Sequence, residues 1–262
     1  MEKYYICNLA VIPMRKEPNH TSEMVSQIRF GEIFEAYDIP MPFGWMYVKT
    51  IHDQYDGWVH CENIRPISAS IFNKLKNRKS VKFSDHGAFL ETEDIPGRVY
   101  LPFGVRVNLN SSNLLSINGV VYKYWGPTLK KTNKLDDVLF FARKLLNTPY
   151  LWGGRSQFGV DCSGFTQVAY QYAAGICLPR DAWQQATFGQ LVEYDDIRKG
   201  DLLFFKSSGD TIVHVGIAMG DKKIIHASGT AGCVVISKFD RVGIKLTKSA
   251  HSHTFAFAKR LL

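Results

Sequence analysis

The segment DCSGF at 161–165 places a cysteine where a helix is predicted to begin. At a helix N-terminus, unpaired backbone N–H groups and the helix dipole point at the first side chains, so we expect them to lower the pKa of Cys162. The same N–H groups could stabilise the oxyanion that forms when a thiolate attacks a carbonyl carbon. Cys162 is therefore a candidate nucleophile. The alternative is a small buried apolar side chain, as most cysteines are.

Two histidines on neighbouring predicted strands are candidates for the base that such a cysteine needs. Strand alternation in the run IVHVGIAM places His214 on the face opposite the core-facing valines, beside two small residues. His226, in the run KIIHAS, follows 12 residues later across a turn, so a hairpin could bring the two rings together as a base and its orienting partner. The alternative is two histidines on solvated strand faces. His251 and His253 alternate on a later strand without a partner cysteine and are expected at the surface.

Helices and strands in the second half of the chain would position these residues. A helix is predicted over 135–146, with Asn133 as its N-cap and Pro149 beyond its end, and a second over 163–174. Strand-like runs follow at 201–205, 212–219, 223–228, 234–237 and 254–260. Helices first and antiparallel-looking strands afterwards indicate an α+β fold.

The first half of the chain has the composition of short strands and turns. Aromatic and β-branched runs at 44–50 and 56–60 lie between Gly, Pro and Asp clusters. A weak repeat relates Phe30-Gly31 to Phe103-Gly104, 73 residues later, and predicts two similar β-rich modules. Each module would have a small core, so we expect it to pack against a neighbour.

Composition excludes several classes of protein. The 262 residues are 45% hydrophobic and 21% charged, which is typical of a globular protein, and no apolar run approaches the ~18 residues of a membrane helix. The first residues lack the pattern of a secretion signal, so a cytoplasmic location is expected. The five cysteines form no CxxC pair, which argues against a zinc ribbon or a disulfide framework. The net charge of +8 is spread along the chain; it favours solubility or attraction of an anionic ligand, without a nucleic-acid motif.

Six segments of the second half occur together in a known family. TPYLWGGRS, DCSGF, LPRDAWQQ, KGDLLFF, VHVGIAMG and IIHASG have the order and spacing of the NlpC-type, papain-like cell-wall cysteine peptidases, which residues 129–262 resemble. RFGE and QYDGWV resemble the first of two bacterial SH3-like barrels in γ-D-glutamyl-L-diamino acid endopeptidases (dipeptidyl-peptidase VI). The second barrel is inferred from the size and the position of its segment alone. The resemblance implies SH3-like barrels at 1–66 and 67–128 and a papain-like α+β domain at 129–262.

The resemblance also implies roles for individual residues. Cys162 would be the nucleophile, His214 the general base and acid, His226 the third, orienting residue and Tyr150 a hydroxyl donor to the oxyanion. The residues implied in substrate binding are Asp161 and Ser163 beside the nucleophile, Tyr55 as a cap of the pocket, and Glu23 as the acidic partner of a substrate amine. Arg180-Asp181 is interpreted as an ion pair that braces a loop.

The implied substrate is a free murein peptide, L-Ala-γ-D-Glu followed by a diamino acid, cut after D-Glu. The chain shows no metal-ligand cluster, phosphate loop or dinucleotide fingerprint, so no metal, cofactor, nucleic-acid or membrane partner is expected, and a monomer is expected. Two alternatives stay open because papain-like sites support several reactions. One is an amidase or acyltransferase on another substrate, and the other is a non-catalytic peptidoglycan-binding module.

Overall fold

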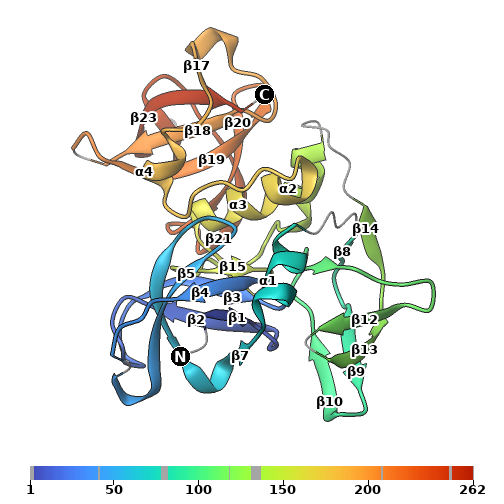
Figure 1. Cartoon of the computed structure of the whole chain (residues 1–262). Coiled ribbons are helices and arrows are strands. Elements are labelled where there is room, and N and C mark those ends of the chain that lie inside the picture. The colour runs from blue at the N-terminus through green and yellow to red at the C-terminus, as the bar shows by residue number, and fades with distance from the viewer. Residues whose placement is uncertain are drawn as a thin grey trace. The chain divides into compact units, whose positions relative to one another are not determined.

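The chain divides into two compact units, an N-terminal unit of residues 1–131 and a C-terminal unit of residues 132–262 (Figure 1). The computed structural model describes residues 3–40, 42–77, 82–117, 119–130, 137–207, 209–247 and 250–261. Within these ranges no helix is both long and apolar enough to cross a membrane. The domain boundaries expected after residues 66 and 128 stay a prediction.

Seven short strands within residues 4–66 form the first sheet of the N-terminal unit. They are β1 (Tyr4–Ile6), β2 (Val11–Arg15), β3 (Met24–Arg29), β4 (Ile33–Ala36), β5 (Trp45–Thr50), β6 (Asp56–His60) and β7 (Arg65–Pro66). The sheet is antiparallel in the order β3-β2-β6-β5-β4-β1-β7. The runs predicted as strands at 44–50 and 56–60 are β5 and β6. Alternate residues of both strands, such as Val48 and Val59, are fully buried in the core of this sheet.

A second set of strands follows a short helix, α1 (Ala69–Lys76), whose N-cap Ser68 accepts a hydrogen bond from the Ile71 N–H. The strands are β8 (Lys82–Ser84), β9 (Phe89–Thr92), β10 (Ile95–Tyr100), β11 (Arg106–Val107), β12 (Leu114–Ile117), β13 (Val120–Trp125) and β14 (Thr128–Lys130). They pair as β10-β9-β13-β12 and β11-β8-β14. One hydrophobic core joins Phe30 of the first sheet, Phe72 of α1 and Tyr122 of the second set. The expected packing between the two β-rich parts is therefore confirmed.

The weak sequence repeat corresponds to the same turn built twice. Gly31 and Gly104 both have a φ of 76°, a left-handed conformation that favours glycine. The Gly31 N–H donates to the Cys7 carbonyl and the Gly104 N–H donates to the Ser84 carbonyl, each over 2.8 Å. The phenylalanine before each glycine is buried. The repeat thus marks a common local structure in the two parts of this unit.

Three helices lie in the C-terminal unit: α2 (Val138–Lys144), α3 (Cys162–Ala173) and α4 (Ala182–Gln185). The helix predicted over 163–174 is α3, shifted by one residue. The helix predicted over 135–146 is α2, but its predicted N-cap Asn133 lies outside the described residues. Every residue of α3 is buried, because the helix packs against both α2 and the sheet.

The sheet of the C-terminal unit contains all the strands expected from the sequence. They are β17 (Gln190–Val192), β18 (Leu202–Lys206), β19 (Ile212–Gly220), β20 (Lys223–Ser228), β21 (Cys233–Lys238) and β23 (His251–Arg260), in the order β17-β23-β18-β19-β20-β21. The strand β22 (Gly243–Lys245) pairs with β23, and a small separate ladder joins β15 (Arg155–Ser156) to β16 (Gly159–Val160). Helix α3 packs on β19 and β20 (Figure 1).

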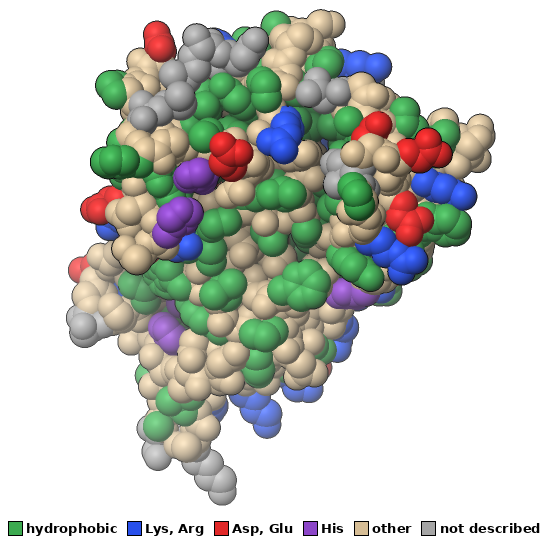
Figure 2. Space-filling view, turned by 90° about the horizontal axis from the view of Figure 1, so that it is seen from below, with side chains coloured by type: hydrophobic (Ala, Val, Ile, Leu, Met, Phe, Trp, Pro, Cys, Tyr) green, Lys and Arg blue, Asp and Glu red, His purple; other side chains and the backbone are tan. Residues whose placement is uncertain are grey.

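Charged side chains of both signs are interspersed with hydrophobic ones on the face shown in Figure 2. That distribution agrees with the even spread of charge along the sequence. The positive net charge is therefore not gathered into one basic patch on this face.

Candidate active site

The first turn of α3 is held rigidly by its N-cap residue and by a close backbone contact. Asp161 precedes the helix in an extended conformation, and its Oδ1 accepts a hydrogen bond from the Gly164 N–H over 2.7 Å. A Cβ on Gly164 would lie 2.1 Å from the Gly154 carbonyl oxygen, so only glycine allows the preceding loop to approach the helix this closely. Cys162 is the first residue of the helix, as the sequence predicted.

The sulfur of Cys162 lies against the backbone of β19 on both sides of His214. It is 4.0 Å from the Val213 carbonyl oxygen, and the Val215 N–H is a hydrogen-bond donor to the thiolate form. Val213 itself is 41% exposed, so its expected place in the core is wrong. Among the described residues, the pairing of β19 with β20 extends no further toward this end than Ile217. The thiol therefore lies within reach of two polar backbone groups of β19, the Val213 carbonyl and the Val215 N–H.

His214 and His226 meet on one face of the hairpin formed by β19 and β20, as predicted. His214 Nε2 lies 2.8 Å from His226 Nδ1, and His226 Nε2 lies 3.1 Å from Ser237 Oγ on β21. When His226 Nε2–H donates to Ser237, its Nδ1 accepts from His214 Nε2–H. That tautomer leaves His214 Nδ1 as a proton acceptor. Sequence reasoning missed Ser237, although Ile224 pairs with it in register, which places it on the face that carries His226.

The expected low thiol pKa is wrong for this structure. Burial raises the pKa of Cys162 to about 12, and Asp161 adds to the rise, outweighing the N–H donors of Val215 and Ser163. Burial also lowers the pKa of His214 well below its usual range, and the neighbouring His226 lowers it further. An isolated charge on either group is disfavoured. Moving the proton from the Cys162 sulfur to the His214 imidazole leaves the net charge of the two groups unchanged. The thiolate and the imidazolium are therefore expected to form together.

The buried state of His226 predicts a pH-dependent stability. Burial lowers its pKa from 6.5 to about 4, so the folded protein binds fewer protons than the unfolded chain between these values. Stability therefore rises with pH in this window and is lost as pH falls below 6.5, by about 2 kcal/mol between pH 7 and pH 5 from this residue alone. Urea denaturation at both pH values measures it. A His226→Gln variant should show a smaller loss over the same interval, and an unchanged loss would contradict the assignment.

Gly216 keeps the space in which His226 lies. A Cβ on Gly216 would come within 2.6 Å of Ile224 Cδ1 and 2.8 Å of His226 Cβ. We expect Gly216→Ala to push the His226 ring away from His214, to cost about 1–3 kcal/mol of stability and to slow turnover about tenfold or more. Gly209→Ala is the matched control, because nothing lies within 4 Å of the added atom. Melting temperature and turnover of both variants test this, and wild-type values for Gly216→Ala would refute it.

His253 belongs to the same cluster, and its predicted surface position is wrong. Its ring stacks on the His214 ring at a centroid distance of 4.6 Å and an interplanar angle of 23°. Only His251 of this pair has an acidic partner, since its Nε2 lies 3.0 Å from Asp240 Oδ1. The contact of His253 could not be predicted from the sequence, because strand alternation does not tell which residues of other strands a side chain meets.

Tyr150 is electrostatically coupled to the Cys162 thiol. Its backbone N–H donates to the Gly232 carbonyl over 2.7 Å, and an isolated bridge pairs it with Val160 just before the nucleophile. Burial raises the pKa of the Tyr150 phenol, and a negative charge on Cys162 raises it further. The phenol therefore stays protonated at neutral pH and can donate a hydrogen bond. Its role as an oxyanion donor stays a prediction.

The residues flanking Cys162 form a buried polar network with Arg180. The Asp161 carboxylate accepts hydrogen bonds from two guanidinium nitrogens of Arg180, from the Gly153 and Gly164 N–H groups and from Ser163 Oγ. These five donors exceed the roughly four lone-pair sites of a carboxylate, so its hydrogen-bonding capacity is fully used. A direct bond from Asp161 to a substrate amine stays a prediction that requires one of these donors to leave. Ser163 Oγ also accepts from Arg180 over 2.9 Å.

The loop that carries Arg180 is fixed by two glutamine side chains. The Gln167 amide donates to the Leu178 carbonyl over 2.9 Å, and the Gln185 amide donates to the Pro179 carbonyl over 2.8 Å. The interpretation of Arg180-Asp181 as an ion pair needs correction. Arg180 pairs with Asp161, whereas Asp181 is the N-cap residue of α4.

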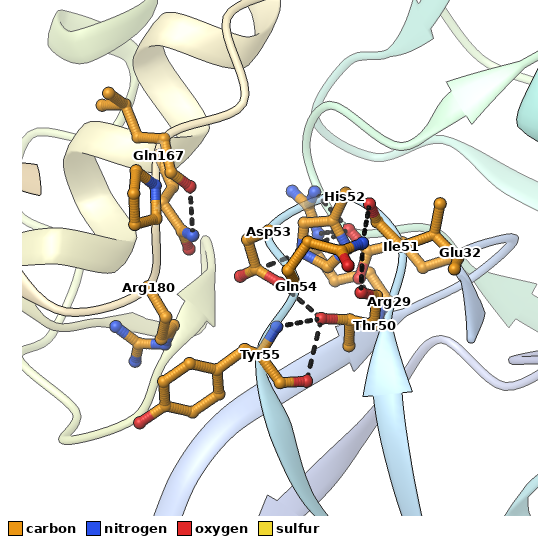
Figure 3. Close-up of polar contacts among 12 residues, drawn as sticks. Arg29, Glu32, Thr50, Ile51, His52, Asp53, Gln54, Tyr55, Gln167 and Arg180 are labelled. Atoms are coloured by element: carbon orange, nitrogen blue, oxygen red, sulfur yellow. Dashed lines mark hydrogen bonds and ion pairs between the residues drawn. The ribbon is translucent and has the colours of Figure 1, made fainter. Parts of the chain in front are cut away.

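Tyr55 and Glu23, the two substrate-binding residues predicted in the first half, belong to the N-terminal unit. The turn before Tyr55 is held by Thr50, whose Oγ1 accepts from the Tyr55 N–H over 3.1 Å and donates to the Asp53 carboxylate (Figure 3). Glu23 lies on the β2–β3 hairpin, where its carboxylate is 3.3 Å from Lys16 Nζ. This pair is exposed and therefore contributes little stability. Roles of Tyr55 and Glu23 at a substrate stay predictions.

Comparison with known proteins agrees with this geometry. Residues 147–254 match the NlpC/P60 family, and residues 14–64 match the bacterial dipeptidyl-peptidase Sh3 domain. A γ-D-glutamyl-L-lysine dipeptidyl-peptidase of Bacillus cereus is 30% identical over 202 residues, which cover 76% of this chain and 56% of that protein. Its Bacillus subtilis counterpart is 39% identical over 112 residues, covering 42% and 38%. The chain thus spans about half the length, or less, of these relatives.

A solved structure shows the same fold over the whole chain. The crystal structure of an NlpC/P60 family protein from Bacillus cereus superposes with a TM-score of 0.82, covers 99% of both chains and is 19% identical. The predicted fold class, a papain-like α+β domain behind an SH3-like β-rich region, is confirmed. Residues 147–254 of this chain, which contain Cys162, His214 and His226, therefore form an NlpC/P60 domain, which follows in the sequence a bacterial dipeptidyl-peptidase SH3 domain at 14–64.

Proposed function

We propose that the chain is a cysteine peptidase that hydrolyses the bond between the γ-carboxyl of D-Glu and a diamino acid in free murein peptides beginning with L-Ala. The observation that carries the proposal is the contact of His214 Nε2 with His226 Nδ1 at 2.8 Å, on the strand that lies against the Cys162 sulfur. Two relatives named γ-D-glutamyl-L-lysine dipeptidyl-peptidases support the choice of bond.

The first half of the reaction forms a thioester. The Cys162 proton moves to His214 Nδ1 as the sulfur attacks the γ-carbonyl carbon. Backbone N–H groups at the start of α3, together with the Tyr150 hydroxyl, would donate to the resulting oxyanion. His214 then gives its proton to the nitrogen of the diamino acid, the C–N bond breaks, and L-Ala-γ-D-Glu stays bound to sulfur as a thioester.

The second half releases the dipeptide. His214 takes a proton from water, hydroxide adds to the thioester carbonyl, and the C–S bond breaks. The sulfur recovers a proton from His214, and L-Ala-D-Glu leaves. His226 stays neutral throughout, because burial lowers its pKa to about 4, and its ring fixes the orientation of His214.

Recognition of a free N-terminal amine is part of the proposal. Tyr55 would supply an aromatic wall for the ammonium of L-Ala and Glu23 a carboxylate, since its exposed pair with Lys16 is easily exchanged. The Asp161 carboxylate, held by Arg180, and Ser163 would bind the part of the substrate next to Cys162. A sugar-linked peptide lacks the amine and could not make the proposed contacts with Tyr55 and Glu23. The cytoplasmic location and the monomeric state stay predictions from the sequence.

Product analysis tests this function. Mass spectrometry of digests of L-Ala-γ-D-Glu-diaminopimelate, and of the peptide with lysine at the third position, should show L-Ala-D-Glu and the free diamino acid. Cleavage of another bond, or turnover of simple thioesters but not of these peptides, would favour an amidase or acyltransferase instead. Binding of the peptide without any product would favour a peptidoglycan-binding module.

Acetylation of the N-terminal alanine is the sharpest change in the substrate. We expect the acetylated peptide to be cleaved at least about 100-fold more slowly, because the amide can neither carry the charge nor fill the same space. Initial rates on the two peptides, measured side by side, give the ratio. Equal rates would refute the amine-binding pocket while leaving the cleaved bond unchanged.

A further inference from the structure

His214 is enclosed by three other rings. His226 meets it edge to face at a centroid distance of 5.0 Å and an interplanar angle of 85°. His253 stacks on its face at 4.6 Å, and Phe205 lies at 6.0 Å. The edge contact with His226 and the face contact with His253 together fix the position and the rotation of the His214 ring. Rotation of His214 about its side chain would break the stack and the bond to His226 together.

The sheet brings His253 to this place although it follows His214 by 39 residues. β18 lies between β19 and β23, and Phe205 pairs with both His214 and Phe255 in register. β18, the strand between them, ends at Lys206. Beyond Lys206, side chains near the start of β23 can meet side chains near the start of β19. The His253 ring is part-buried, and its Nδ1 lies 3.0 Å from Ser252 Oγ.

The charged side chains on the strands beside His253 pair with one another, so the titratable groups that interact with its ring are His214 and His226. On β18, Lys206 pairs with Asp210 at 2.7 Å. On β22, Lys245 pairs with Asp240 at 3.1 Å, and the same carboxylate binds His251 on the strand of His253. On β17, the third strand element beside β23, no residue is charged. Among the described residues, no carboxylate forms an ion pair with the His253 ring.

We propose that His253 is a positioning residue of this site: its neutral ring holds the His214 imidazole in place, and its protonation at low pH prevents His214 from carrying the catalytic proton. A neutral aromatic face attracts the imidazolium that His214 becomes during the reaction. A positive charge stacked at 4.6 Å repels it, so the cluster takes up one proton at a time. Because His253 is less buried than the other two rings, solvent protons reach it first.

The proposal rests on the proposed roles of Cys162 and His214, but it can be tested without turnover. Burial lowers the pKa of His253, and the charge of a protonated His253 lowers the pKa values of both His214 and His226. In a Cys162→Ala protein, NMR titration of the imidazole signals should show His214 and His253 titrating in shared, two-step curves. Independent one-step curves for the two rings would overturn the proposal.

A variant separates charge from shape in the same Cys162→Ala background. His253→Gln keeps a flat polar group and removes the charge, so His214 should titrate at a pH higher by on the order of one unit. His251→Gln is the matched control, two residues away on the same strand, and should leave the His214 curve unchanged. If His253→Gln also leaves that curve unchanged, the proposal fails. If this variant does not fold, the shared curves of the parent protein still decide.

The pH profile of the intact enzyme adds a readout that a merely structural role would not move. In His253→Gln, kcat/KM should fall several-fold at neutral pH because the stack is weaker, and its acid limb should extend to lower pH by on the order of one unit. An acid limb that stays in place would contradict the proposed effect of protonation. Absence of any peptidase activity would refute the proposed function, whereas the NMR curves would still test the positioning role.

Discussion

Cys162→Ala should abolish hydrolysis of L-Ala-γ-D-Glu-diamino acid while leaving its binding intact. The alanine keeps the Cβ and the backbone of α3, so the pocket and the N–H groups at the helix start remain. No other group at this position can form the thioester, and we expect a loss of at least about 10⁴-fold in kcat. Product formation followed by mass spectrometry and peptide binding followed by calorimetry measure the two effects.

The matched control for this substitution is Cys177→Ala. Cys177 is exposed in the same unit and should tolerate the change with nearly wild-type turnover. A Cys162→Ala protein that retained turnover within about tenfold of wild type would rule out covalent catalysis at this sulfur. Loss of binding together with turnover would instead show that the thiol is required for the pocket itself.

His214→Ala is expected to have the second largest effect. It removes the group that accepts the thiol proton and returns it to the leaving amine, so kcat should fall by about 10³-fold or more. Because burial raises the pKa of Cys162 to about 12, the thiol without its base should also react slowly with iodoacetamide at neutral pH. The rate of alkylation at pH 7 and peptide turnover are measured on the same sample.

His251→Ala serves as the control for His214→Ala, since His251 binds Asp240. Among the described residues, the rings in contact with His214 are those of Phe205, His226 and His253. The control variant should keep the wild-type alkylation rate and turnover. An alkylation rate that is equal in the wild type and in His214→Ala would contradict proton transfer between sulfur and imidazole. If the variant without His214 still turns over the peptide, another residue must be the base.

The candidate catalytic groups could be predicted because their positions follow from local rules. Asp161 caps a helix and Cys162 begins it, which the apolar spacing of 163–174 and the preceding aspartate already indicate. His214 and His226 lie on one face because a two-fold alternation continues across the hairpin of β19 and β20. Such rules act within a few residues and need no knowledge of the complete sheet.

The features that sequence reasoning missed depend on contacts between distant strands. His253 stacks on His214 only because β18 ends between their strands, and Ser237 meets His226 only through the register of β20 with β21. The direction of the thiol pKa was predicted wrongly, because the helix dipole is local whereas burial of Cys162 comes from the packing of α3 on the sheet. Arg180 was paired with its sequence neighbour instead of with Asp161 for the same reason.

Trapping the acyl-enzyme tests the central claim most directly. The wild-type protein is mixed with L-Ala-γ-D-Glu-diamino acid, quenched in acid within the first turnovers, digested and analysed by mass spectrometry. We expect the peptide containing Cys162 to gain the mass of an L-Ala-γ-D-Glu acyl group, hydroxylamine to remove this group, and Cys177→Ala to retain the adduct. Products that form without an adduct on Cys162, or an adduct on a different side chain, would contradict the account.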